Sequence, residues 1–185
     1  MQQKMLQLSK HFFATIIAIT LLSACSTGSS RLIEAEKLNF SYSDDAYLFF
    51  RNMRQTKYVY QNMEEKQLRL YTHKDYQKTS LSTSLVVNWR ANKAFAILNV
   101  PEELDKQSIK FFWNDNGQYR PIEAPNFRRQ GELQLLTNLY NHLLQEHELL
   151  ISIKKGEKTP LFTDVDEQEA FRISMYDFYR LTNVL

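Results

Sequence analysis

The sequence predicts a β-dominated α+β fold, namely an antiparallel β-sandwich or curled sheet that carries one amphipathic helix near residues 132–146. Three observations predict this class. Several segments alternate polar and apolar residues, an Asn-Gly pair separates two such segments, and one later segment repeats its apolar residues every three or four positions. We therefore expect strands joined by tight turns, with a helix packed on the sheet.

One strand and two hairpins are predicted in the middle of the chain. Residues 67–72 alternate as a strand does, and residues 81–89 and 93–100 form longer apolar runs on either side of a short turn. A second hairpin is predicted around Asn116-Gly117, because this pair readily adopts the positive φ angles of a type I′ turn. The predicted strands of this hairpin are residues 109–113 and 118–122.

The predicted helix spans residues 132–146. Its apolar residues form one stripe after a glycine: Leu133, Leu136, Leu139, Tyr140, Leu143 and Leu144. Residues 148–154 then have the composition of a strand, and residues 159–162 are expected to return beside it after a turn at 155–157. We expect the helix to pack on the sheet.

Residues 47–60 support two interpretations. The run Ser43-Asp44-Asp45 is suited to cap a helix whose face would carry Tyr47, Phe50 and Met53. The aromatic and β-branched residues at both ends of the segment are typical of strands. We favour the strand.

Residues 166–183 also support two interpretations. Asp164 and Glu167 have the spacing of a capping box, and a helix that starts there would place Phe171 and Met175 on one face. The alternation of Phe171, Ile173 and Met175 with polar residues is typical of a strand instead. We expect a final strand that completes the sheet, with the helix as the alternative.

The start of the chain has the features of an export signal. Lys4 and Lys10 precede the uninterrupted run of apolar residues and threonines at 12–22, which is shorter than the roughly 20 residues of a membrane-spanning helix. The run ends in Leu22-Ser23-Ala24-Cys25, which resembles the lipobox of bacterial lipoprotein precursors. The chain is therefore expected to work in the bacterial envelope.

This resemblance implies a division of the chain into three parts. Residues 1–24 would be a signal peptide, residues 25–30 the lipidated Cys25 with a flexible tether, and residues 31–185 a single globular domain. Cys25 would carry a diacylglycerol and an amide-linked acyl chain such as palmitate, and two or more chains give durable anchoring. In such precursors Ser26 favours sorting to the outer membrane, so the domain would face the periplasm.

Charge and cysteine content restrict the function further. The chain has 23 Lys and Arg against 21 Asp and Glu, and removal of Lys4 and Lys10 with the signal leaves 21 of each. A domain without net charge lacks the basic surface that binding to nucleic acid requires, so no nucleic-acid partner is expected. Cys25 is the single cysteine, so the fold has no disulfide framework and depends on its apolar core.

One histidine cluster superficially suggests a zinc site. His142, Glu146 and His147 are close in sequence, but five residues of continuous helix would rotate the second imidazole away from the first. Only His73 could add a further imidazole beyond the signal segment. We therefore expect no metal, and a surface pair of His142 with Glu146.

Acidic groups offer no catalytic site either. Asp164, Asp166, Glu167 and Glu169 lack the glycine of a calcium loop and are expected to be solvated acids at a turn or helix start. The adjacent acids of Glu64-Glu65 and Glu102-Glu103 diverge, so they are expected to be surface charges. No nucleophile motif surrounds a serine and no glycine-rich loop occurs, so the sequence predicts no catalytic residue, no cofactor and no enzyme.

Aromatic residues make up 13% of the chain, and most are expected to fill the core. Basic and aromatic residues that could instead bind a partner lie at Arg51, Arg54, Lys57, Tyr58 and Tyr60, and the roles of Tyr60 and Trp89 stay open. The leading hypothesis is a non-catalytic docking or assembly subunit that holds an envelope protein near the membrane. The alternative is a ligand-binding lipoprotein that holds a glycan or lipid in an aromatic-lined pocket.

Overall fold

The computed structural model describes residues 31–185 except 77–80, 103, 124–125 and 154–156. Leu32–Leu185 form one compact unit. The predicted signal peptide, Cys25 and the tether lie outside the described residues, so the structure leaves these predictions as they stand.

Four antiparallel strands form the first sheet, in the order β1-β2-β3-β4. The strands are β1 (Tyr58–Met63), β2 (Leu68–His73), β3 (Ser82–Asn88) and β4 (Lys93–Asn99). Neighbouring strands are also neighbours in sequence, and the register places Tyr71 opposite Leu85 and Leu85 opposite Ala96. The strand predicted at 67–72 and the hairpin predicted at 81–100 are both confirmed.

The second sheet is smaller and has the order β6-β5-β7-β8. Its strands are β5 (Lys110–Asp115), β6 (Gln118–Ile122), β7 (Leu149–Ser152) and β8 (Thr159–Pro160). Asn116 and Gly117 have φ angles of 50° and 90°, as a type I′ turn requires. The predicted Asn-Gly hairpin is therefore confirmed, and so are the strands predicted near 148–154 and 159–162.

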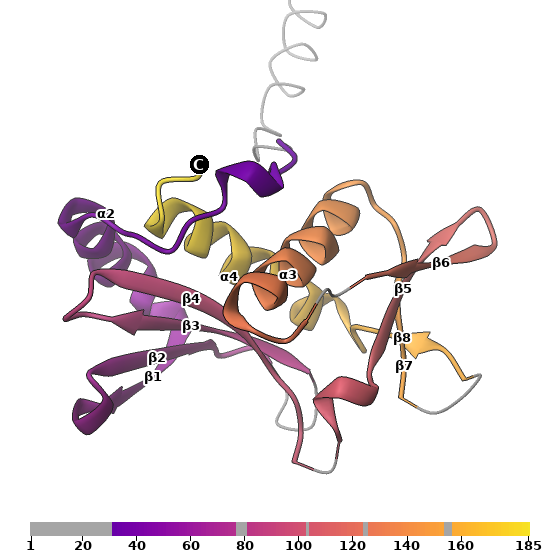
Figure 1. The fold of residues 1–185 in the computed structure, drawn as a ribbon, viewed down its shortest axis with the longest axis horizontal. Coiled ribbons are helices and arrows are strands. Elements are labelled where there is room, and N and C mark those ends of the chain that lie inside the picture. Colours follow the sequence, from indigo (N-terminus) through magenta and orange to yellow (C-terminus); the bar gives the residue numbers. More distant parts are fainter. Residues whose placement is uncertain (1–30, 77–80, 103, 124–125, 154–156) are drawn as a thin grey trace, which may run out of the picture. The chain divides into compact units, whose positions relative to one another are not determined.

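Two long helices cover one face of the first sheet (Figure 1). Helix α3 (Arg129–Leu144) packs against β4 and also contacts β6 and β7, whereas α4 (Val165–Leu181) packs against β2, β3 and β4. The fully buried side chains of the core include Leu85, Leu133, Leu136, Met175 and Phe178. The α+β class with open antiparallel sheets and a helix near 132–146 is confirmed.

The segment predicted as a strand at 47–60 is helical for most of its length. It contains α2 (Asp44–Phe49), the π-helical η2 (Phe50–Arg54) and the 3₁₀ turn η3 (Gln55–Lys57), and strand structure begins only at Tyr58. The prediction failed because the cap outweighed strand propensity: the Ser43 hydroxyl accepts a hydrogen bond from the Ala46 amide at 3.3 Å. The remaining 3₁₀ turns are η1 (Ala35–Lys37), η4 (Glu64–Lys66) and η5 (Lys106–Ser108).

The final strand predicted at 166–183 is also wrong, because this segment is helix α4. The Asp164 carboxylate accepts a hydrogen bond from the Glu167 amide at 2.8 Å and caps the helix. Phe171, Met175 and Phe178 then lie on one helical face and are buried against the sheet. Burial of that face favours the helix over the strand that local alternation indicated.

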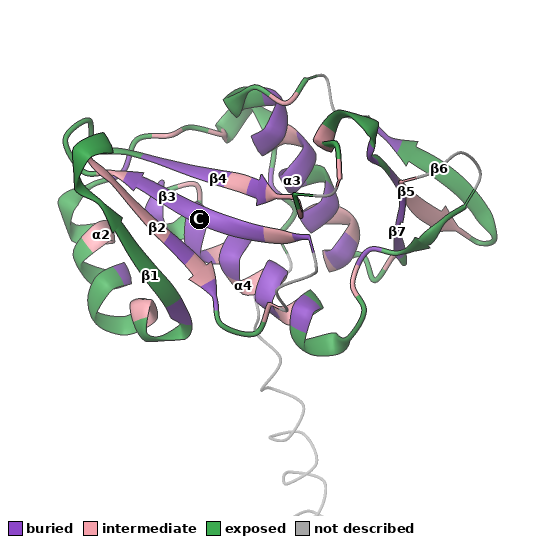
Figure 2. Ribbon diagram, turned by 90° about the horizontal axis from the view of Figure 1, so that it is seen from below, coloured by how far each residue is buried: buried purple, intermediate pink, exposed green. Residues whose placement is uncertain are grey.

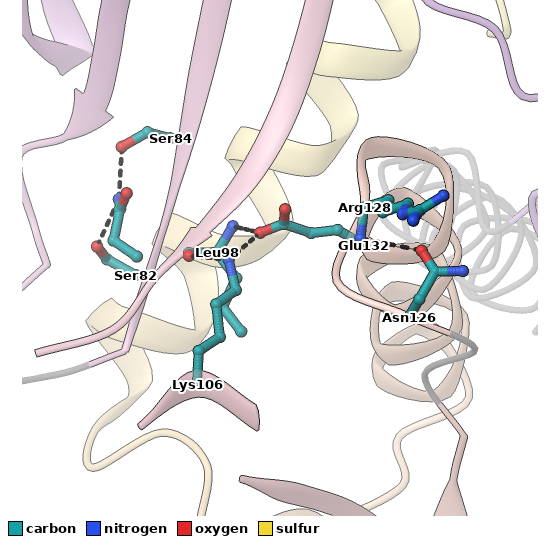
Figure 3. A network of polar contacts seen from close by, with 8 residues as sticks. Ser82, Ser84, Leu98, Lys106, Asn126, Arg128 and Glu132 are labelled. Atoms are coloured by element: carbon teal, nitrogen blue, oxygen red, sulfur yellow. Dashed lines mark hydrogen bonds and ion pairs between the residues drawn. The ribbon is translucent and has the colours of Figure 1, made fainter. Parts of the chain in front are cut away.

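The β4 edge of the first sheet is closed by other parts of the chain. The Ala94 amide donates to the carbonyl of Phe40 at 2.7 Å, and the Leu98 amide donates to the Glu132 carboxylate at 2.6 Å. Lys106 donates to the Leu98 carbonyl at 2.8 Å and also contacts Glu132 (Figure 3). The Ala94 amide and the amide and carbonyl of Leu98, which an edge strand would expose, therefore have partners within the domain.

Candidate docking surface

The opposite edge of the first sheet, β1, is open. Five of its six residues are exposed, and only Tyr58 is buried (Figure 2). Its sequence, YVYQNM, contains no charged residue and no proline, which are the residues that usually keep an edge strand from pairing. Apart from β2, no described element hydrogen-bonds to the backbone of Tyr58–Met63. Among the described residues, the strand is thus an uncharged edge whose outer side has no backbone partner.

Large apolar side chains are exposed on and next to this edge. Val59, Tyr60 and Met63 of β1 are 52%, 41% and 37% exposed. Leu48 and Met53, at 55% and 63%, are exposed on the helical segment that precedes β1. We call the β1 edge together with the exposed apolar side chains of α2 and η2 the docking surface; its members are Leu48, Phe49, Met53 and Tyr60 on the side of the helical segment, and Val59 and Met63 on the other face of the strand.

The helical segment is held in place through its opposite side. Phe50 is buried, and its ring lies 5.4 Å from that of Tyr58 and 5.0 Å from that of Tyr71. Leu48 and Phe49 precede Phe50 on other faces of the helix and are exposed, and Met53 is exposed because the π-helical turn after Phe50 rotates it away from the core. The exposed side chains therefore sit on a fixed support, which lowers the entropic cost of binding.

An ion pair between the half-buried Arg54 and the buried Asp177 fastens η2 to α4. The Arg54 Nε atom lies 2.8 and 3.0 Å from the two carboxylate oxygens of Asp177, and the Tyr58 hydroxyl donates to the same carboxylate at 2.7 Å. Asp177 is 2% exposed. Burial and the Asp177 charge raise the pKa of Tyr58 far above its usual range, so its hydroxyl stays protonated and donates. The network joins residues that are far apart in the chain.

A second polar cluster links α2 to the sheet. The Arg69 guanidinium donates to the Tyr47 hydroxyl at 2.5 Å, and this hydroxyl lies 3.1 Å from that of Tyr71. The guanidinium also lies 5.8 Å from the Tyr47 ring centroid and 5.9 Å from that of Trp89. The structure thus places Tyr60 and Trp89, whose roles the sequence left open, at the partly exposed rim of an aromatic cluster.

Of the basic residues near these aromatics, Arg54 donates to the Asp177 carboxylate, which also accepts from the Tyr58 hydroxyl. Arg51 lies 5.9 Å from the Tyr47 ring centroid, and Lys57 is exposed. The expectation that most rings fill the core holds for Phe50, Tyr58 and Tyr71, which are all nearly fully buried.

A hollow of about 310 Å³ lies beside the docking surface, between α2, η2 and the end of α4. Its wall includes Phe49, Arg54, Asp177, Arg180 and Leu185. The Arg180 guanidinium lies 4.6 Å from the Phe49 ring centroid. The mixture of apolar and charged groups suits contact with a protein partner better than enclosure of an apolar ligand.

A second hollow, of about 450 Å³, lies against the second sheet. Aromatic and aliphatic side chains form much of its wall: Ile109, Phe111, Phe112, Ile122 and Phe127. Its volume falls within the range of small-molecule pockets, about 300–1,000 Å³. This hollow is the structural feature that corresponds to the alternative, ligand-binding hypothesis.

His142 and His147 are brought together, contrary to the argument from their spacing. Their Nδ1 atoms lie 3.0 Å apart, and both rings stack on Trp113. In an uninterrupted helix the two imidazoles would point in different directions, but α3 ends at Leu144 and Glu146 adopts a positive φ of 60°. The chain therefore turns back, and the His147 amide donates to the His142 carbonyl at 3.1 Å.

The pairing of the two imidazoles replaces the expected contact between His142 and Glu146, whose side chain is exposed. Burial and the neighbouring His147 lower the pKa of His142. His73 lies elsewhere, on β2. In the part of the chain that the structure describes, no group of three or more His, Cys, Asp or Glu side chains is placed to hold a metal ion.

The acids near residue 164 were expected to be solvated, which is wrong for Glu167: it is 1% exposed, because its carboxylate turns back onto Thr163 at the start of α4. Asp164 caps the helix, and the Glu167 carboxylate accepts from the amide and the hydroxyl of Thr163 at 3.0 and 2.7 Å. Arg172 forms an ion pair with Glu169, and Asp166 is exposed. Glu64-Glu65 and Glu102 are exposed, whereas Glu103 lies outside the described residues.

The burial of Asp177 and Glu132, like that of Glu167, was not predicted from the sequence. A signal for Asp177 was present, because the helical interpretation of 166–183 places it on the same face as Ser174 and Phe178.

None of the helices in the described part of the chain is long and apolar enough to span a bilayer.

Comparison with protein-family models, with curated proteins and with solved structures found no match to this chain.

Proposed function

We propose that this protein is a lipid-anchored, non-catalytic docking or assembly subunit of the bacterial envelope. Acylated Cys25 holds it on the outer membrane, and the domain on the periplasmic side binds an envelope protein through the docking surface. The observation that carries the proposal is the contrast between the two sheet edges: β4 is closed by the rest of the domain, whereas β1 is uncharged, exposed and next to apolar side chains.

The docking surface has the properties of a protein-binding site. An open edge strand offers main-chain hydrogen bonds to an extended segment, and exposed apolar side chains beside it add contact area and selectivity. Its support is rigid, because Phe50 packs into the core and Arg54 is paired with Asp177. The lipobox resemblance and the balanced charge of the domain support an envelope location and argue against nucleic acid.

Site-specific photo-crosslinking in intact cells tests this function. A photoreactive amino acid replaces Met53 or Val59 in the docking surface, and Val165, which is 78% exposed on α4, serves as the matched control. We expect the same crosslinked protein from positions 53 and 59 and none from position 165. Crosslinking that is equal at all three positions, or absent from positions 53 and 59, would contradict the proposal.

The hollow beside the second sheet favours a second candidate function, the binding of a lipid or glycan. Phe112 is half-buried at its wall, and Lys158 lies 4.9 Å from the Phe112 ring centroid. Titration with a fluorescent fatty acid and, separately, with soluble glycan fragments tests this candidate. Saturable binding that Phe112→Ala abolishes and Tyr119→Ala preserves would support it, and the absence of saturable binding to both probes would eliminate it.

A further inference from the structure

We propose that the occupant of the β1 edge is a second copy of this chain, paired antiparallel to the first with Gln61 on the twofold axis. This inference deepens the proposed function by naming one partner of the docking surface, and it rests on that function. The pair would join the two four-stranded sheets into one continuous sheet.

Hydrogen-bond geometry restricts the possible registers. In an antiparallel pair, opposite residues both point their N–H and C=O groups at the other strand, or both point them away. In a pair of identical strands the twofold axis must therefore pass through a residue, because an axis between two residues would oppose groups of different orientation. Tyr60 and Gln61, the two residues at the middle of β1, are the available centres.

The side chains favour Gln61. An axis at Gln61 places Val59 opposite Met63 of the second copy, and both belong to the same face of the sheet. Val59 is 52% exposed and Met63 is 37% exposed, so the pairing would bury two apolar side chains at each end of the pair. An axis at Tyr60 would instead place Lys57 opposite Met63.

The charges that flank β1 are complementary in the same register. Lys57 immediately precedes the strand and Glu65 lies in the turn that follows it, and both are exposed. With Gln61 on the axis, Lys57 of each copy lies opposite Glu65 of the other, in the η4 turn that also contains Lys66. Opposite charges at the ends of a cross-strand pair stabilise it, and twofold symmetry produces each contact twice.

The apolar and charged side chains of β1 and its flanks therefore match those of a second, antiparallel copy, which favours a second copy over an unrelated extended segment. The uncharged centre of β1 avoids like-charge repulsion at the axis, and its charged flanks attract each other across it. An unrelated segment would need a separate match to Lys57, Val59 and Met63.

Disulfide trapping tests the register. In the full chain with Cys25→Ser, Gln61→Cys introduces a single thiol, and Val165→Cys gives the matched control on an exposed site. In mild detergent and under gentle oxidation, we expect a rapid covalent dimer from Gln61→Cys and none from the control. Equal slow dimerisation of the two variants would overturn the proposal.

Charge exchange tests the pairing without a disulfide. Lys57→Glu creates two like-charge contacts and should weaken dimerisation roughly tenfold in sedimentation equilibrium, and Glu65→Lys should have the same effect. An equimolar mixture of the two variants should dimerise at least as well as the wild type, because every Lys then faces a Glu. A mixture as weak as the separate variants would overturn the proposal.

One outcome separates this inference from the proposed function. If the wild-type chain is a monomer at micromolar concentrations while positions 53 and 59 crosslink to a different envelope protein, self-pairing is wrong and the docking function stands. If it is a dimer and no other protein crosslinks, self-pairing stands and the proposal of a different envelope partner fails.

Discussion

The two edge strands of the first sheet, β4 and β1, differ in whether their outward backbone groups have hydrogen-bond partners. At β4, the Ala94 and Leu98 amides donate to Phe40 and Glu132, so the domain itself supplies partners for these two amides. At β1, the described part of the chain supplies no such partner beyond β2, and the side chains are uncharged and, except for Tyr58, exposed. Within the described part of the chain, one edge is thus protected and the other is open, and this difference is the observation on which the proposed docking function rests.

A buried acid from a helix lies near each edge, and the two acids accept hydrogen bonds from different kinds of group. Glu132 of α3 accepts from the β4 backbone and from Lys106. Asp177 of α4 accepts from the Arg54 and Tyr58 side chains, and thus holds the helical segment that presents Leu48 and Met53. Glu132 therefore helps to close the β4 edge, whereas Asp177 supports the helical segment next to the β1 edge.

Removal of the acid on the β1 side should have the largest effect. Asp177→Ala leaves the Arg54 charge and the Tyr58 hydroxyl without their acceptor, and should lower the free energy of unfolding by about 3–5 kcal/mol. Urea denaturation measures this loss. Gln168→Ala, at an exposed position of the same helix, should change stability by less than about 0.5 kcal/mol. Equal effects of the two substitutions would contradict the role of Asp177.

Removal of the acid on the β4 side should cost less. Glu132→Ala leaves the buried Leu98 amide unsatisfied, for a loss of about 2–3 kcal/mol, whereas Lys106 retains access to water. Glu132→Gln keeps an acceptor for the amide and should lose about 1 kcal/mol. Equilibrium denaturation of both variants is the measurement. A Glu132→Gln protein as unstable as Glu132→Ala would show that charge, and not the acceptor, closes this edge.

Acidification should lower the free energy of unfolding through His73, which lies opposite Tyr58 of β1 in the register and is 4% exposed. Burial lowers the pKa of His73 below its ordinary value of 6.5, although Asp75 opposes the shift. The unfolded chain therefore binds the proton more readily, and the stability conferred by neutral His73 is present above pH 6.5 and is lost as the pH falls below it.

Thermal unfolding between neutral and mildly acidic pH checks this dependence. His73→Leu should reduce the slope of stability against pH in this window, and His142→Gln should reduce it separately, because the pKa of His142 is also lowered. A slope that neither substitution changes would mean that other groups control the acid sensitivity.

The smallest effect on stability is expected at the centre of β1. Gln61→Lys gives this edge a charge of the kind that Lys93 supplies on β4, and should change the free energy of unfolding of the monomer by less than about 0.5 kcal/mol. The same change places two like charges at the twofold axis and should weaken dimerisation roughly fivefold. Sedimentation and denaturation of the same sample separate the two effects.

The sequence predicted elements where local signals and tertiary packing agree. The Asn116-Gly117 hairpin and the α3 stripe are examples, because turn chemistry and apolar spacing lead to the same structure there. It failed at α2 and at 166–183, where aromatic and β-branched residues indicated strands while capping and burial of one face produced helices.

The candidate site was less predictable than the fold. An open edge exists only once the strand order is known, and no local pattern in YVYQNM shows that β1 lies at the end of the sheet. Likewise, Arg54 and Asp177 are joined by folding and not by spacing. The contact between His142 and His147 required the end of α3, which residue spacing alone did not reveal.

Amide hydrogen exchange of the two edge strands at increasing protein concentration tests the central claim most directly. We expect the amides of Lys93–Asn99 to keep the same protection throughout, because their partners lie within the domain. The amides of Tyr58–Met63 should gain protection as concentration rises and a second copy covers them. Exchange of Tyr58–Met63 that does not change with concentration would contradict the pairing of the open edge.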